Sequence, residues 1–341
     1  MKPALLVIGP SRSGSSALTA VLSLVGASLP ATLMPPGPGN PHGHFEPQRL
    51  MELNEEILAA HGLAYWDPIP IPPTWFDSAE AAGFTTRIAE TITAEYASRP
   101  LPIIKDPRLC RTAPLHIAAL HLLGLTPHAI IPHRHPAAAA RSLASRDNTP
   151  PETAELLQIR ELLGAELHTA TLPRAWSRYD DLLANWRHTT AQIAATLNLT
   201  WPTHPDQAAP AIEAFLAPSL RHHTTDTAAG PLAEHLYTAT SHDEATLHTT
   251  FHAVRTILDE HDRLLAPWHT TLRARLAQLA PIVLAQARDL ETRTSEIAAL
   301  HTIIANLQAS TSWRLTAPLR TLARLLGRDV SDKREGKPEG N

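Results

Sequence analysis

The stretch from Ala4 to Ser16, "ALLVIGPSRSGSS", decides the fold of this chain. Its first five residues, ALLVI, form an apolar run without a polar break, which is typical of a strand buried on both faces of a parallel sheet. A loop containing Gly9 and Gly14 follows at once, and Ser15–Val25 then carries apolar residues at helical spacing. A strand, a glycine-containing turn and a helix in this order predict an anion-binding turn, because the first amides of the helix point toward the loop.

Short apolar runs and helical segments alternate further along the chain. Leu101–Lys105 and Ala129–His133 are two more candidates for buried strands. Helices are expected after them, through Leu123 and from Pro136, and also over Glu46–His61, Thr153–Leu172 and Asp180–Leu197. This alternation predicts an α/β fold of the P-loop type, with three layers and a central, mostly parallel sheet.

Composition bounds the class of protein. The chain has 341 residues, of which 43% are apolar and 18% charged, so a sizeable core is expected. A formal charge of −4 argues against a broad nucleic-acid surface, and no nucleic-acid partner is expected. No cysteine and histidine spacing of the zinc type occurs, so we expect no metal, although His42, His44, His133 and His135 lie close together in pairs.

The same features predict a cytoplasmic protein. Cys110 is the single cysteine, which excludes an intrachain disulfide and suits a reducing compartment. The run ALLVI is shorter than the roughly 7–15 apolar residues of a secretory signal. The sequence contains no run of about 18 apolar residues, so no membrane-spanning helix is predicted.

Three segments are expected along the chain: a nucleotide-binding domain over 1–222, a helical extension over 223–310, and a basic amphipathic segment with a disordered tail over 311–341. Within the extension, helices are expected over His242–Leu265 and Pro267–Leu307. Leu290, Ile297 and Ile304 recur every seven residues, which indicates a short coiled coil or a helical hairpin. The segment "SWRLTAPLRTLARLLGR" suits either peripheral contact with an anionic membrane or homo-oligomerisation, and both interpretations stay open.

The glycine loop lacks the lysine on which nucleotide hydrolysis depends. Gly9 and Gly14 have the spacing of the G-x-x-x-x-G-K-[ST] loop, but Ser15 stands where the lysine would reach the β- and γ-phosphates. Arg12 is the loop's cation, and Ser13, Ser15 and Ser16 add hydroxyl donors. Such a loop suits a nucleotide end without β- and γ-phosphates.

Three blocks together resemble the sulfotransferases that use 3′-phosphoadenosine 5′-phosphosulfate (PAPS). "SRSGSS" resembles their 5′-phosphosulfate loop, "HRHPAAAARSLASR" their 3′-phosphate motif, and "RYDDLLANW" the segment whose tyrosine lies near the adenine. The resemblance covers roughly residues 4–222 and implies PAPS as co-substrate. The residues that it assigns to PAPS binding are Arg12, Ser13, Gly14, Ser15, Ser16, Arg134, Ser142 and Tyr179.

The chain also departs from that family. Small-molecule members carry a histidine base in K-x-H, whereas "IIKDPRLCR" has Lys105 and no histidine; the late R-K-G-x-x-G loop is absent too, with Arg221 as a candidate replacement cation. "GHFEPQRL" resembles a G-[HRW]-[FW]-E segment of bacterial carbohydrate and glycolipid sulfotransferases. That resemblance implies Glu46 as the base, with Arg12 and Lys105 neutralising charge, and a saccharide or glycolipid hydroxyl as acceptor. The C-terminal segment resembles tails of surface-polysaccharide biosynthesis enzymes.

Alternatives remain for the chemistry. The glycines could serve only a tight turn, Arg134 a helix cap, Tyr179 core packing, and Glu46 a favourable charge at a helix N-terminus. An ion-pair cluster without catalytic function could be formed by Lys105, Asp106 and Arg108. Two other functions stay open as well: a degenerate P-loop kinase or NTPase, and a non-catalytic nucleotide-binding scaffold in polysaccharide biosynthesis.

Overall fold

The computed structural model describes residues 2–37, 40, 43–97, 99–216, 228–315, 317 and 320. The chain divides into two units, Met1–Asp259 and Glu260–Asn341, which are described separately.

The first unit is built on a four-stranded sheet in which every pair of neighbours is parallel. Its strands are β1 (Lys2–Val7), β2 (Ile103–Lys105), β3 (Leu125–His133) and β4 (Arg174–Arg178), in the order β2-β1-β3-β4. Leu6 of β1 pairs with Ile104 on one side and Ala129 on the other. The predicted α/β class with a central parallel sheet is confirmed.

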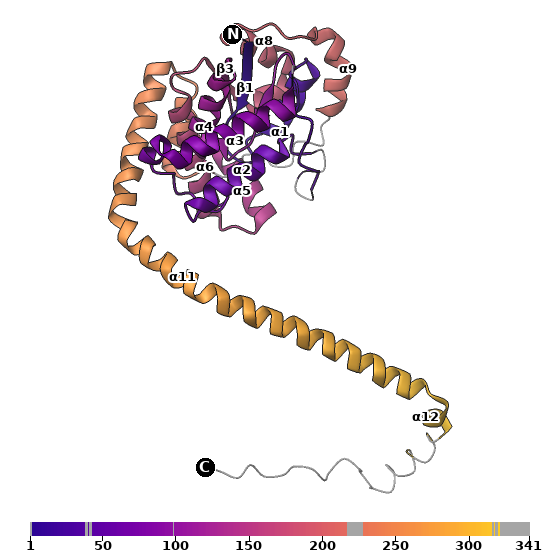
Figure 1. Ribbon diagram of the computed structural model, residues 1–341. Helices are drawn as coiled ribbons and strands as arrows, with labels where there is room; N and C mark the ends of the chain where they lie inside the picture. The colour runs from indigo at the N-terminus through magenta and orange to yellow at the C-terminus, as the bar shows by residue number, and fades with distance from the viewer. Residues whose placement is uncertain are drawn as a thin grey trace. The chain divides into compact units, whose positions relative to one another are not determined.

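The side chains of β1 alternate between two apolar layers, so the sheet is covered on both faces (Figure 1). Leu5 and Val7 pack into the layer that contains α1 (Ser15–Leu24), α8 (Trp186–Thr196) and α9 (Pro205–Phe215). Ala4 and Leu6 pack into the layer that contains α2 (Gln48–Ala60), α3 (Ala79–Tyr96), α4 (Leu109–Leu122) and α6 (Pro151–Thr169). The remaining short elements before residue 200 are η1 (Pro73–Asp77), α5 (Pro136–Asp147) and α7 (Tyr179–Ala184).

The compact unit extends beyond the expected domain boundary at residue 222. Helix α10 (Pro231–Ala239) and the first turns of α11 (Glu244–Ala309) bury Leu236, Leu247 and Phe251 in the layer around α4 and α6. These side chains complete the core, and the unit therefore ends at Asp259.

Helix α11 is one continuous helix where the sequence predicts two, over His242–Leu265 and Pro267–Leu307. Pro267 and Pro281 both lie inside it. A proline removes one backbone hydrogen bond and costs a helix interior about 3 kcal/mol, but neither proline ends this helix.

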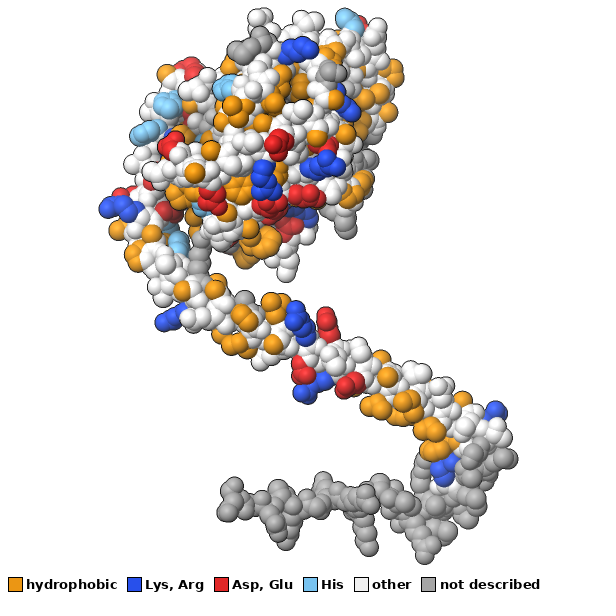
Figure 2. All heavy atoms as spheres, in the orientation of Figure 1, with side chains coloured by type: hydrophobic (Ala, Val, Ile, Leu, Met, Phe, Trp, Pro, Cys, Tyr) orange, Lys and Arg blue, Asp and Glu red, His pale blue; other side chains and the backbone are white. Residues whose placement is uncertain are grey.

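The second unit contains the rest of α11 and α12 (Thr311–Leu315). Large apolar side chains at every seventh position of α11 are exposed: Leu276, Val283, Leu290, Ile297 and Ile304. Figure 2 shows hydrophobic side chains along this part of the helix. Most of the predicted basic segment and tail lies outside the described residues. Among the helices described, none combines the length and apolar character that crossing a bilayer requires.

Candidate active site

Residues predicted to bind nucleotide, and the predicted catalytic cation Lys105, lie at the carboxyl ends of the four strands. The loop with Arg12 follows β1, Lys105 ends β2, Arg134 follows β3, and Tyr179 follows β4. Parallel α/β sheets bind ligands at this edge, beside the strand where the order of connections reverses. In the order β2-β1-β3-β4 that strand is β1, so the glycine loop stands at the expected position.

Gly14 is required by both its conformation and its neighbour. Its φ is 89°, in the left-handed region, directly before α1, and a side chain there would collide with the ring of Tyr179. Arg12 also has a left-handed φ, of 64°. Tyr179 is buried in the apolar layer around α1, so it packs in the core and against the loop at once.

The loop and the candidate 3′-phosphate block are in direct contact. Arg12 Nε donates a hydrogen bond of 2.9 Å to Ser142 Oγ, on helix α5. The guanidinium carbon of Arg134 lies 4.8 Å from the ring centroid of Tyr179. Four residues from three separate sequence blocks therefore form one cluster.

The charges of Arg134 and Arg146 act on Arg12 in this cluster, and Asp147, which lies 2.6 Å from Arg146, balances part of them. Burial lowers the pKa of Arg12, and the nearby charges of Arg146 and Arg134 lower it further. Mutual repulsion among guanidinium groups makes the cluster favourable for an anion. No motif in the sequence marks Arg146, although it lies four residues after Ser142 on the same helix and hence on the same face.

Lys105 and Glu46 form a buried ion pair beside the loop. Lys105 Nζ lies 2.6 Å from Glu46 Oε1, and the two side chains are 3% and 6% exposed. Lys105 Nζ also donates to the carbonyl oxygen of His44 at 3.1 Å and to Ser16 Oγ at 3.4 Å. The predicted base, the predicted strand-end cation and a loop serine thus meet at one point.

The pair belongs to a larger charge network, which also contains Asp106 and Arg108. Arg108 lies 3.5 Å from Glu46 and 2.9 Å from Asp106. Asp106 accepts a further hydrogen bond of 2.8 Å from Asn54. Glu46 is buried before the start of α2 at Gln48 and is not an exposed charge on the first turn of that helix.

A second carboxylate, Glu161 of α6, supports the back of the loop. Its Oε2 accepts a hydrogen bond of 2.8 Å from the Ser11 amide, and the Ser11 hydroxyl is hydrogen-bonded to the Tyr65 hydroxyl. Burial raises the pKa of Glu161 to about 7 and, together with the charge of Glu161, raises the pKa of Tyr65 to about 12. No sequence motif marks Glu161, because it stands in the middle of a helix far from the loop in sequence.

The site retains a polar group that a ligand could satisfy. Ser13 Oγ is buried and has no hydrogen-bond partner among the described residues. Within the described ranges, no three histidine, cysteine, aspartate or glutamate side chains are grouped so that they could hold a metal ion. His42 and Arg221, which the sequence analysis named, lie outside the described residues.

Comparisons with known proteins give similarities in structure only. No family model matches the chain, and no curated protein matches it. Among solved structures, the sulfotransferase domain of the Synechococcus PCC 7002 olefin synthase aligns over 71% of this chain and 95% of its own, with 18% identity and a TM-score of 0.43. The sulfotransferase domain of the curacin biosynthetic pathway aligns over 71% and 99%, with 16% identity and a TM-score of 0.39. Sulfotransferase STF1 of Mycobacterium tuberculosis H37Rv aligns over 64% and 77%, with 14% identity and a TM-score of 0.37.

Proposed function

We propose that this protein transfers a sulfuryl group from PAPS to a hydroxyl group of a carbohydrate or glycolipid. One observation carries the proposal: the 2.9 Å hydrogen bond between Arg12 of the loop and Ser142 of α5. It supports the proposal because it joins the loop to the candidate 3′-phosphate block, and the 3′- and 5′-phosphates of the donor are attached to one ribose.

Each part of the donor has a candidate partner. The loop amides, Ser15 and Ser16 would hold the 5′-phosphosulfate at the N-terminus of α1. The 3′-phosphate would bind Arg134 and Ser142, and the adenine would lie near Tyr179. The hydroxyl group of Ser13, which is buried without a partner in the described residues, would donate a further hydrogen bond to the phosphosulfate.

Glu46 is the proposed base, and Lys105 and Arg12 are the proposed electrostatic groups. Glu46 takes the proton from the acceptor hydroxyl while the oxygen of that hydroxyl forms a bond to sulfur. The bond between sulfur and the bridging phosphate oxygen breaks, and 3′,5′-bisphosphoadenosine leaves with that electron pair. Sulfuryl transfer, like phosphoryl transfer, is accelerated mainly by positioning and by neutralisation of charge. Lys105 is within reach of both the loop serine and Glu46, so it can balance charge on the donor while the acceptor hydroxyl takes its place at Glu46.

A degenerate P-loop kinase or NTPase is the weaker alternative, because Ser15 stands where the phosphate-binding lysine is needed. A non-catalytic scaffold would need the same donor site but no base. Binding alone therefore does not separate the scaffold from the enzyme; the requirement for Glu46 does.

The donor site is tested by thermal unfolding with 3′,5′-bisphosphoadenosine, ADP or ATP at equal concentrations. We expect the bisphosphate to raise the Tm most, because it alone of the three carries the 3′-phosphate that Arg134 and Ser142 would bind. A ligand at a hundred times its Kd stabilises the folded state by about 2.7 kcal/mol. Arg134→Ala should remove most of that shift. Arg87→Ala is the matched control, because Arg87 is an exposed arginine paired with Glu56 on the helical layer. Equal shifts from ADP, or a full shift in the Arg134 variant, would refute the assignment.

A further inference from the structure

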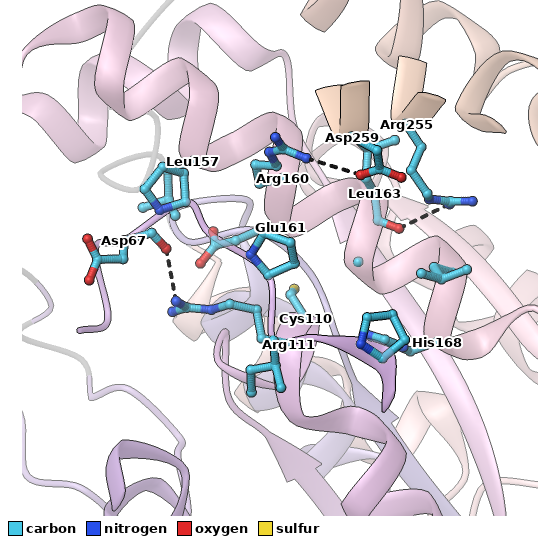
Figure 3. Close-up of a pocket in the computed structure, with 16 residues that line it drawn as sticks. Asp67, Cys110, Arg111, Leu157, Arg160, Glu161, Leu163, His168, Arg255 and Asp259 are labelled. Carbon is cyan, nitrogen blue, oxygen red and sulfur yellow. Dashed lines mark hydrogen bonds and ion pairs between the residues drawn. The ribbon is translucent and has the colours of Figure 1, made fainter. Parts of the chain in front are cut away.

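A cavity of about 220 Å³ lies in the first unit, apart from the residues assigned to the donor. Its walls come from the loop after α2, from α4, from α6 and from the first turns of α11 (Figure 3). Most of the wall is apolar, formed by Pro70, Ile71, Leu157, Leu163 and Leu167. An apolar cavity of about 150 Å³ is already large enough to bind benzene, so this one has room for a substituted ring or a short alkyl chain.

The charges around the cavity balance. Figure 3 shows Asp67 and Arg111 on one side and Arg160, Arg255 and Asp259 on the other, with Glu161 between them. The cations already have partners: Arg160 lies 3.8 Å from Asp259, and Arg255 lies 2.6 Å from Glu166. Arg111 donates to three backbone carbonyls, among them that of Tyr65 at 2.7 Å. The cavity therefore does not require a charged ligand.

Glu161 offers the cavity a carboxyl group that can either accept or donate a hydrogen bond. It is buried, its pKa is raised to about 7 by that burial, and it lines the cavity. Its Oε2 accepts from the Ser11 amide at 2.8 Å, and its Oε1 accepts only a longer hydrogen bond of 3.4 Å from the Ser11 hydroxyl. Near neutral pH its carboxyl group can accept a hydrogen bond from a hydroxyl or donate one to it. His168 lines the same cavity from the same helix, α6, and burial lowers its pKa to about 4, so its ring is uncharged near neutral pH.

From these observations we infer that the cavity is a binding site for a small neutral molecule with an apolar body and one hydroxyl group, and that the hydroxyl binds Glu161. The inference does not rest on sulfuryl transfer, because none of the proposed donor-binding or catalytic residues lines this cavity. Glu161 also accepts a hydrogen bond from the amide of Ser11, which belongs to the glycine loop. A ligand that binds Glu161 would therefore contact a residue that itself contacts the loop.

The test is isothermal titration of the full chain with p-cresol and with toluene, which differ by one hydroxyl group. We expect p-cresol to bind, and toluene to bind about five- to tenfold more weakly for want of one hydrogen bond. Leu167→Trp should fill the mouth of the cavity and weaken p-cresol binding by at least about tenfold, a free-energy loss that one overlapping ring easily exceeds. Leu156→Trp is the matched control, because Leu156 is an exposed leucine on the same helix that does not line the cavity.

Circular dichroism and a cooperative thermal unfolding transition without ligand show that each variant is folded. No binding of p-cresol to the parent protein would overturn the inference, as would unchanged binding in Leu167→Trp or equal loss in the two tryptophan variants. Equal affinity for toluene would overturn the contact with Glu161. If 3′,5′-bisphosphoadenosine does not raise the Tm of the parent protein, the proposed function is refuted, but the measured binding of p-cresol to the cavity is unaffected.

Discussion

The buried pair of Lys105 and Glu46 makes a prediction in which stability and catalysis separate. The two charges are 2.6 Å apart and almost fully buried. Removing one partner of such a pair costs about 3–5 kcal/mol, because the other charge stays buried without compensation. In Lys105→Met, Arg108 remains 3.5 Å from Glu46 and compensates in part, so we expect a loss of about 3 kcal/mol, the lower end of that range.

Glu46→Gln should cost a similar amount, about 3 kcal/mol, because Lys105 then stays buried without a carboxylate, although the amide oxygen still accepts a hydrogen bond from it. In the double variant both charges of the pair are removed, so neither is left buried alone. Replacing a buried ion pair by uncharged groups of similar volume often changes the free energy of unfolding very little. We therefore expect its stability to return to within about 1 kcal/mol of the parent protein. Urea unfolding of the four proteins gives these free energies as a double-mutant cycle.

Turnover should behave differently from stability. If Glu46 and Lys105 carry the reaction, sulfate transfer is lost in both single variants and stays lost in the double variant. The Tm shift with 3′,5′-bisphosphoadenosine should persist in Glu46→Gln, which then binds donor without turning it over. Recovery of turnover in the stable double variant would make the pair purely structural, and additive stability losses would show that the two residues are not coupled.

Three more predictions test the loop, the buried carboxylate and the long helix. Gly14→Ala should lower the Tm, because the left-handed conformation costs about 1–2 kcal/mol with a side chain and the methyl group has no room; Gly83→Ala, in open space within a helix, should raise it by the equivalent of about 0.5–1 kcal/mol. The pKa of Glu161 is raised from 4.5 to about 7, so the folded state binds its proton more tightly, and stability is lost as pH rises through that window. From pH 5 to 8 the free energy of unfolding should fall by up to about 3 kcal/mol more in the parent protein than in Glu161→Gln, and parallel curves would contradict this. Ile297→Glu should convert a self-associated species to monomer in light scattering, whereas Leu284→Glu, exposed but off the seven-residue stripe, should leave the mass unchanged; a monomeric parent protein would end the coiled-coil prediction.

The buried strands could be predicted because each is a short apolar run. β1 shows this most clearly, since both of its faces pack against helices. β4 escaped prediction because it is an edge strand whose side chains alternate between buried Ala175 and Ser177 and half-buried neighbours, among them two arginines. The unit boundary escaped for a related reason, since α10 and the start of α11 carry ordinary amphipathic patterns that do not say which surface they cover.

The candidate site was predictable where a motif marks a strand end. Arg12, Lys105, Arg134 and Tyr179 each follow or end a strand, and parallel topology brings those ends together. Glu161 could not be found in this way, because its contact with the loop depends on how α6 packs. Whether Lys105 would pair with Asp106 or with Glu46 was equally open, since only the path of the loop before α2 decides it.

The cluster of Arg12, Arg134 and Arg146 has a consequence for how this protein is handled. Positive charges held close together in a partly buried place disfavour one another; Asp147, paired with Arg146, offsets part of that cost, and a bound oxyanion would offset more of it. Inorganic sulfate or phosphate in a purification buffer should therefore act as a stabiliser and, if the proposed donor site is correct, as a competitor of 3′,5′-bisphosphoadenosine. Apparent affinities measured in such buffers would be too weak, and dialysis into chloride of matched ionic strength should restore them.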